Sequence, residues 1–125
     1  MATILIADDD KNIARALCVR LRSDGYETLT AHDGVSAVQK AVQENPDLIL
    51  LDISMPAGNG LFVAEQLKSM DTTRDTPIIF MTAKSNPEYF DQAMEREAIA
   101  FLAKPFDDAA LLPLVYTTLD AEPQV

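Results

Sequence analysis

The 125-residue chain is poor in the residue types and segments that define several common classes of protein. Its one cysteine, Cys18, cannot form a disulfide within the chain and lies in a helical-looking stretch, so we expect a packing role in a reducing compartment. No apolar run approaches the roughly 20 residues that a membrane-spanning helix needs. The four glycines form no glycine-rich phosphate loop. These absences favour a cytoplasmic globular protein that does not associate with membranes.

Basic residues are also scarce. Ten Lys and Arg residues stand against 20 Asp and Glu residues, which gives a formal charge of −10. Because proteins bind nucleic acids mainly through Lys and Arg contacts with phosphates, we do not expect this chain to bind nucleic acid directly. The length suits one compact domain that buries a core without disulfides. We assign residues 1–120 to this domain and residues 121–125 to a short tail.

Apolar segments alternate with amphipathic segments along the chain. This alternation is typical of an α/β fold, in which helices cover both faces of a parallel sheet through right-handed crossovers. Functional residues are then expected at the carboxyl ends of the strands. The predicted strands are 3–7, 26–31, 47–51, 78–81 and 99–103, and the predicted helices are 11–24, 33–44, 61–70, 87–95 and one from 107 onward.

Acidic residues follow two of the apolar runs. Asp8, Asp9 and Asp10 come after the run at 4–7, and Asp52 comes after the run at 48–51. If the two runs are neighbouring parallel strands, these carboxylates converge at one edge, where their mutual repulsion calls for a cation. Mg²⁺ prefers oxygen ligands, so the pattern predicts a magnesium site and phosphoryl chemistry. Asp10 is expected to cap the first helix instead, because Asp is favoured at that position.

Four motifs occur in order, each after the appropriate strand. They are Ile-Ala-Asp8-Asp9-Asp10, Leu-Leu-Asp52-Ile-Ser-Met55-Pro56, Met-Thr82-Ala83 and Lys104-Pro105-Phe106. Together they resemble the receiver domain of bacterial response regulators. The resemblance covers nearly the whole chain and implies a doubly wound, flavodoxin-like sheet of strand order 2-1-3-4-5 with five flanking helices. The native-looking start and the polar tail favour a stand-alone protein.

The resemblance implies a role for each of these residues. Asp52 would accept a phosphoryl group from a phosphohistidine on a sensor histidine kinase or a histidine phosphotransfer protein. Thr82 and Lys104 would hold the phosphoryl oxygens, and the domain would catalyse only its own phosphorylation and dephosphorylation. Mg²⁺, or Mn²⁺ as a substitute, would be bound by Asp8, Asp9, Asp52 and the backbone carbonyl of Ser54.

The same resemblance implies how the signal would leave the site. Thr82 and Phe101 would form a two-state switch that repacks the fourth helix, the fifth strand and the fifth helix. That surface would then bind an effector or a second copy of the chain. Ser54 and Lys84, two residues beyond Asp52 and Thr82, would face the site mouth and tune the phosphoryl lifetime.

The last predicted helix has a second apolar stripe. No charged residue occurs from 109 to 119, and a core-facing stripe is already supplied by other residues of the segment. Pro113 is expected to kink or delay this helix. An additional apolar stripe on a surface helix indicates a docking or dimer face. Its residues are Leu112, Tyr116 and Leu119.

Two residues depart from the family pattern, and one polar residue has no assigned role. Asn59 stands where an acid usually follows the Met-Pro turn. Glu97 stands where a glycine usually precedes the fifth strand, so the turn before Phe101 is expected to differ from that of the family. His32, the only histidine, is expected to be a solvated strand-end residue, because nothing beside it would complete a site.

Two other functions fit parts of the pattern. Asp8 and Asp10 have the Asp-x-Asp spacing of a haloacid-dehalogenase-like Mg²⁺ phosphatase, in which Asp8 would be the nucleophile. That interpretation leaves Asp52 unexplained, lacks the following threonine and provides no room for a substrate-selecting cap. A flavodoxin-like cofactor binder is the other alternative, but the chain has no excess of aromatic residues to support it.

Overall fold

The computed structural model describes residues 2–53, 55, 60–82, 100–103 and 108–120, and for residues 100–103, 108 and 109 it describes the backbone alone. Five strands form one parallel sheet in the order β2-β1-β3-β4-β5. This order confirms the doubly wound, flavodoxin-like architecture. The strands are β1 (Thr3–Ala7), β2 (Glu27–Ala31), β3 (Leu48–Asp52), β4 (Ile78–Thr82) and β5 (Ala100–Ala103). The described helices are α1 (Lys11–Ser23), α2 (Gly34–Glu44), α3 (Gly60–Lys68) and α5 (Asp108–Asp120).

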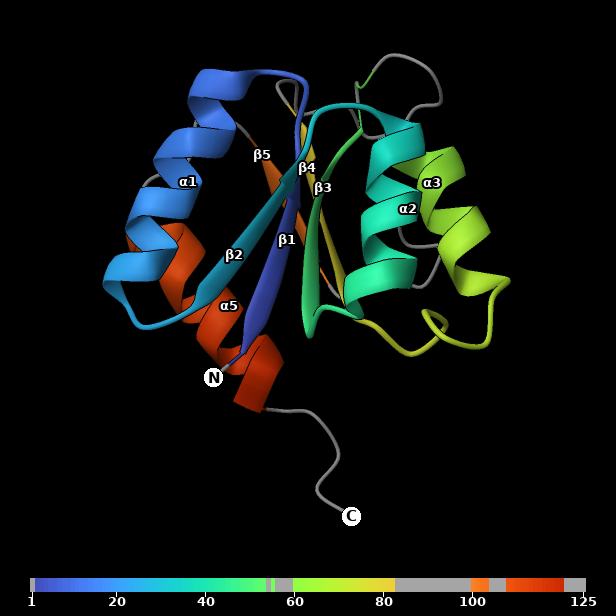
Figure 1. Cartoon of the computed structure of the whole chain (residues 1–125). Coiled ribbons are helices and arrows are strands. Elements are labelled where there is room, and N and C mark those ends of the chain that lie inside the picture. Colours follow the sequence, from blue (N-terminus) through green and yellow to red (C-terminus); the bar gives the residue numbers. More distant parts are fainter. Residues whose placement is uncertain (1, 54, 56–59, 83–99, 104–107, 121–125) are drawn as a thin grey trace.

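Helices cover both faces of the sheet (Figure 1). Helices α1 and α5 lie on one side, and α2 and α3 lie on the other. The N-terminus lies at one end of β1, and α1 begins beyond the other end of this strand. Because all the strands are parallel, their carboxyl ends meet at that second edge. The predicted helix 87–95 lies outside the described residues.

The core has two layers because successive side chains of each strand point to opposite faces of the sheet. Ile4 and Ile6 of β1 pack toward α1 and α5, whereas Leu5 and Ala7 pack toward α2 and α3. Strands β3 and β4 are buried along their whole length, as expected of central strands in a parallel sheet covered on both sides. Cys18 is buried in the cluster beneath α1, which confirms its packing role.

Acidic caps begin two of the helices. The Asp10 carboxylate accepts hydrogen bonds from the N–H groups of Asn12 and Ile13, at 2.9 and 3.3 Å, which confirms Asp10 as the N-cap of α1. The Asp33 carboxylate accepts one from the Ser36 N–H at 2.8 Å and caps α2. These caps fix the points where the chain leaves the sheet and enters each helix.

Element boundaries differ from the sequence prediction by one or two residues. Helix α1 ends at Ser23, and Gly25 follows with a φ of +94°, a conformation that glycine adopts without strain. Strand β3 includes Asp52, which was predicted to lie just beyond it. Helix α3 begins at Gly60 and ends at Lys68, instead of spanning 61–70.

Helix α5 runs through Pro113 and starts five residues before it, so the proline does not delay the helix. The expected boundary at residue 107 and the tail at 121–125 lie outside the described residues. Among the helices described, none combines the length and apolar character needed to cross a bilayer.

Candidate functional site

Three carboxylates meet at the carboxyl edge of the sheet. Asp8 follows β1, Asp9 lies in the bend before α1, and Asp52 is the last residue of β3. One carboxylate oxygen from each lies within 4.8 Å of the other two. Asp8 and Asp52 are buried, at 0 % and 3 % exposed, whereas Asp9 is exposed. The sequence prediction that these acids converge is therefore confirmed.

Backbone and side-chain hydrogen bonds hold Asp8 in place. Its N–H donates to the carbonyl oxygen of Ala31 at 3.0 Å, which ties it to the end of β2. Its carboxylate accepts a hydrogen bond from the Asp10 N–H at 2.9 Å. Its own carbonyl oxygen lies 3.1 Å from Nδ1 of His32. Asp8 is thus fixed by the neighbouring strand and by the start of α1.

His32 lies directly after β2, as predicted, but it is not the solvated residue that was expected. The ring is half-buried and contacts the backbone of Asp8. Strand β2 pairs with β1, and Ala31 is in register with Ala7, so the residue after each strand lies at the same edge. The adjacency of these strands was the signal that could have placed His32 near the acids.

The position of Asp52 depends on β4 and α3. Asp52 is in register with Met81, and the Ile53 N–H donates to the Met81 carbonyl at 2.9 Å. On the other side, the Gly60 N–H donates to the Ile53 carbonyl at 2.9 Å. A Cβ on Gly60 would overlap the backbone carbonyl oxygen of Asp52. Sequence analysis missed Gly60, which the start of α3 places directly against the end of β3.

Thr82 ends the next strand. It is 1 % exposed and is the last residue of β4, in register with Ala103 of β5. Phe101 belongs to β5, where its backbone is in register with Phe80. These placements put Thr82 at the same edge as Asp52, on the strand next to β3. The remaining predicted site residues, and both departures from the family pattern, lie outside the described residues: Ser54, Lys84, Lys104, Asn59 and Glu97.

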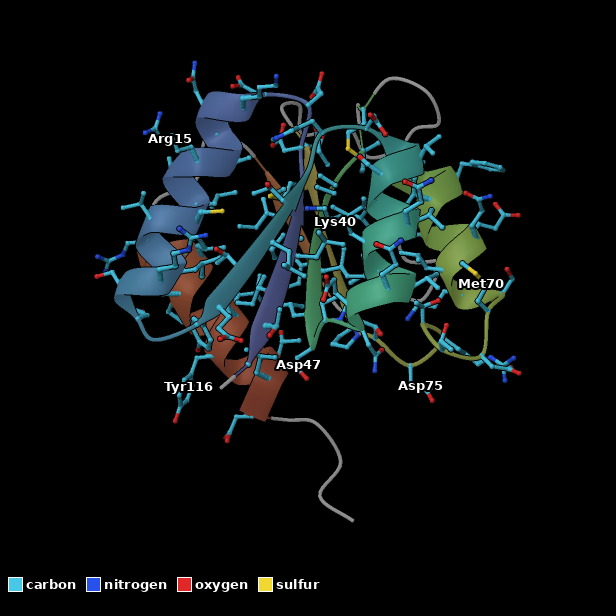
Figure 2. All side chains as sticks on the ribbon, viewed as in Figure 1. Arg15, Lys40, Asp47, Met70, Asp75 and Tyr116 are labelled. Atoms are coloured by element: carbon cyan, nitrogen blue, oxygen red, sulfur yellow. The ribbon has the colours of Figure 1, made fainter. Side chains whose placement is uncertain are left out.

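The predicted second stripe on α5 is exposed only in part. Leu112 and Leu119 are half-buried against the core, whereas Tyr116 is 64 % exposed and points away from the sheet (Figure 2). Burial raises the pKa of the Tyr26 hydroxyl above its ordinary value, and the charges of Asp24 and Tyr116 raise it further. A docking role for this stripe stays a prediction, and Tyr116 is its most exposed member.

Comparison with known proteins identifies the family. The model of the response regulator receiver domain matches residues 4–116. The chain belongs to this family. It is therefore a receiver domain of two-component signalling. The comparisons give no support to the phosphatase alternative, and Asp10, the second acid of that motif, caps α1.

Individual relatives are similar over the whole receiver. The response regulator PleD of Caulobacter vibrioides is 40 % identical over 114 residues, which are 91 % of this chain and 25 % of PleD. The chemotaxis protein CheY4 of Vibrio cholerae has a TM-score of 0.89 and 30 % identity, covering 94 % of this chain and 98 % of that chain. The receiver domain of the sensor histidine kinase PA1611 of Pseudomonas aeruginosa, solved with magnesium coordinated in its active-site cleft, has a TM-score of 0.89 and 27 % identity, covering 96 % and 98 %. This receiver thus spans a quarter of the length of the curated relative PleD.

The three carboxylates suit a divalent cation such as Mg²⁺. All of their candidate ligand atoms are oxygens, which Mg²⁺ prefers. Oxygens on opposite sides of Mg²⁺ lie about 4 Å apart, because each bond is roughly 2.0–2.1 Å long. The three ligand oxygens, which all lie within 4.8 Å of one another, are thus close to the spacing that such an ion requires.

Proposed function

We propose that this receiver accepts a phosphoryl group on Asp52 from the phosphohistidine of a sensor histidine kinase or a histidine phosphotransfer protein. The observation that carries the proposal is the meeting of Asp8, Asp9 and Asp52 within 4.8 Å at the edge where β4 ends in Thr82. A structural cap accounts for Asp10, but capping does not require the other three acids. Their convergence suits a metal-assisted transfer to a carboxylate.

The chemistry requires positive charge at this edge. A carboxylate oxygen of Asp52 forms a bond to phosphorus while the bond from phosphorus to the histidine nitrogen breaks, and the imidazole leaves with that electron pair. Both reactants are anionic, so their approach is unfavourable without compensation. Mg²⁺, when bound, supplies this charge and orients the phosphoryl oxygens. Asp8, Asp9 and Asp52 would hold it together with the Ser54 carbonyl, and Mn²⁺ would be able to substitute.

Thr82 and Lys104 would complete the site. The Thr82 hydroxyl donates a hydrogen bond to a phosphoryl oxygen, and the Lys104 ammonium neutralises part of its charge. The burial of Thr82 at the end of β4 supports this role, because it stands one strand away from Asp52. Ser54 and Lys84 would tune how long the phosphoryl group survives. The domain acts on no other substrate in this proposal.

The output would be a rearrangement of the surface built from the fourth helix, β5 and α5. Movement of Thr82 toward the phosphoryl group vacates space that Phe101 can enter, and β4 and β5 are directly paired. The altered surface would bind an effector or a second copy of the chain, with Tyr116 as an exposed contact. We place the protein in the cytoplasm, where two-component kinases present their phosphohistidine.

Intact mass spectrometry tests the phosphorylation step. The wild type, Asp52→Asn, Asp8→Asn and Asp10→Asn are incubated with Mg²⁺ and acetyl phosphate. We expect one phosphoryl adduct on the wild type and on Asp10→Asn, none on Asp52→Asn and a strongly reduced amount on Asp8→Asn. An adduct that persists in Asp52→Asn but disappears in Asp8→Asn would refute the proposal in favour of Asp8 as the nucleophile.

A further inference from the structure

His32 contacts the peptide that joins two of the metal-binding acids. Its Nδ1 lies 3.1 Å from the carbonyl oxygen of Asp8. A carbonyl oxygen can only accept, so Nδ1 carries the proton and donates. That carbonyl belongs to the planar unit that also contains the nitrogen and Cα of Asp9. A bond to the oxygen therefore restrains the direction in which the chain leaves Asp8 and enters Asp9.

We propose that His32 is a positioning residue for the metal site, acting through the Asp8–Asp9 peptide. The inference rests on the proposed function, because it takes the three carboxylates as the magnesium ligands. The residue before His32 supplies the complementary restraint, since the Ala31 carbonyl accepts the N–H of Asp8 at 3.0 Å. The end of β2 thus holds the peptides on both sides of the Asp8 Cα.

Asp9 is the ligand that gains most from this restraint. Asp52 is buried within β3, and Asp8 is buried directly after β1, with which β3 pairs. Asp9, in contrast, is exposed and lies in a bend. The bend is fixed at its far end by the Asp10 N–H, which donates to the Asp8 carboxylate, and by the cap that Asp10 makes on α1. His32 fixes its near end. Because the bend is anchored at both ends, the Asp9 carboxylate loses less conformational entropy when the metal binds, and this favours binding.

The ring has a simpler explanation as a half-buried space filler, and substitutions separate the two roles. His32→Leu keeps most of the apolar bulk but removes the donor. His32→Asn loses bulk but places an N–H donor at the same number of bonds from Cα as Nδ1. If the hydrogen bond matters, Asn should retain the function that Leu loses; if packing matters, the order should be reversed.

Magnesium titration is the decisive measurement. Binding is followed by the amide NMR signals of Asp8, Asp9 and Asp10, with all variants in the same buffer. We expect His32→Leu to bind Mg²⁺ about three- to tenfold more weakly than the wild type, the range expected for one hydrogen bond. His32→Asn should bind within about twofold of the wild type. The rate of phosphorylation by acetyl phosphate should fall in His32→Leu at low Mg²⁺ and recover at saturating Mg²⁺.

The outcomes distinguish this inference from the proposed function. A wild type that shows no saturable Mg²⁺ binding would overturn the proposed function itself. A wild type that binds Mg²⁺, with His32→Leu binding equally well, would overturn only the role of His32. Weaker binding in Asn than in Leu would also overturn it, because packing would then be the cause. An independent check is the ring ¹⁵N spectrum of His32, in which an unprotonated Nδ1 would contradict the hydrogen bond.

Discussion

Gly60 is the position where one methyl group tests how tightly Asp52 is held. A Cβ there would overlap the carbonyl oxygen of Asp52 and lie 2.9 Å from both the carbonyl carbon of Asp52 and the Cα of Ile53. All of these are backbone atoms, so no side-chain rotation can relieve the contact. Protein interiors are close-packed, and the start of α3 and the end of β3 would have to separate by roughly 1 Å. Gly60→Ala should therefore move the proposed nucleophile.

Two magnitudes follow from that displacement. Overpacking of this kind costs about 1–3 kcal/mol, so we expect the free energy of unfolding of Gly60→Ala to fall by about that amount. A misplacement of about 1 Å can slow a reaction about 10²-fold, because the attacking atom no longer aligns with the bond that breaks. Phosphorylation of Asp52 in Gly60→Ala should accordingly be roughly 10- to 100-fold slower than in the wild type.

Gly25→Ala is the matched control. Gly25 has a φ of +94°, and a Cβ there would meet nothing within 4 Å, so this variant suffers backbone strain without a steric clash. The strain should cost about 1–2 kcal/mol. The residue precedes β2, whereas Asp52 is the last residue of β3, so in this parallel sheet the two lie at opposite ends of the strands. Gly25→Ala should thus lose stability without losing phosphorylation rate.

The assay combines urea unfolding with a time course of intact mass under acetyl phosphate and saturating Mg²⁺. All variants are compared at a temperature where each is folded. A Gly60→Ala protein that is phosphorylated at the wild-type rate would show that the end of β3 does not depend on this close approach. Equal slowing in Gly25→Ala would show that the rate follows global stability, and the positional argument would fail.

Two further predictions concern the acidic caps. Asp10→Ala should lower the free energy of unfolding by about 1 kcal/mol in urea titrations. Asp10→Ser should retain most of the wild-type stability, because a serine hydroxyl, like the Asp10 carboxylate, can accept hydrogen bonds from the N–H groups of Asn12 and Ile13. Loss of the Asp52 phosphoryl adduct in folded Asp10→Ser would contradict the assignment of Asp10 as a cap. The hydrogen bond from the Ser36 N–H lowers the pKa of the Asp33 carboxyl below 3.8 in the folded protein. The ionised Asp33 carboxylate therefore stabilises the fold above pH 3.8, and this contribution is lost as the pH falls through the lower pKa of the folded state. Asp33→Asn should flatten the stability–pH curve below about pH 4, and a curve unchanged from the wild type would exclude this contribution.

The residues of the proposed chemistry could be brought together from the sequence because each one lies at the end of a strand that is visible there. The apolar runs before Asp8, Asp52 and Thr82 mark the strands, and parallel strands bring their carboxyl ends together without any knowledge of detailed packing. Asp10 could be predicted as a cap for a similar reason, since capping depends only on the residues that follow it. Local pattern was sufficient for all four.

The residues that hold those groups could not be predicted in the same way. His32 reaches the site only because β2 pairs with β1, and that pairing joins residues 24 positions apart in the chain. Gly60 matters only because α3 begins directly against the backbone of Asp52, a contact that depends on where the helix starts. The site therefore combines acids that periodicity reveals with supports that only topology reveals. Variants of His32 and Gly60 should change metal binding or the phosphorylation rate although all three carboxylate side chains are still present, and this behaviour separates positioning from chemistry.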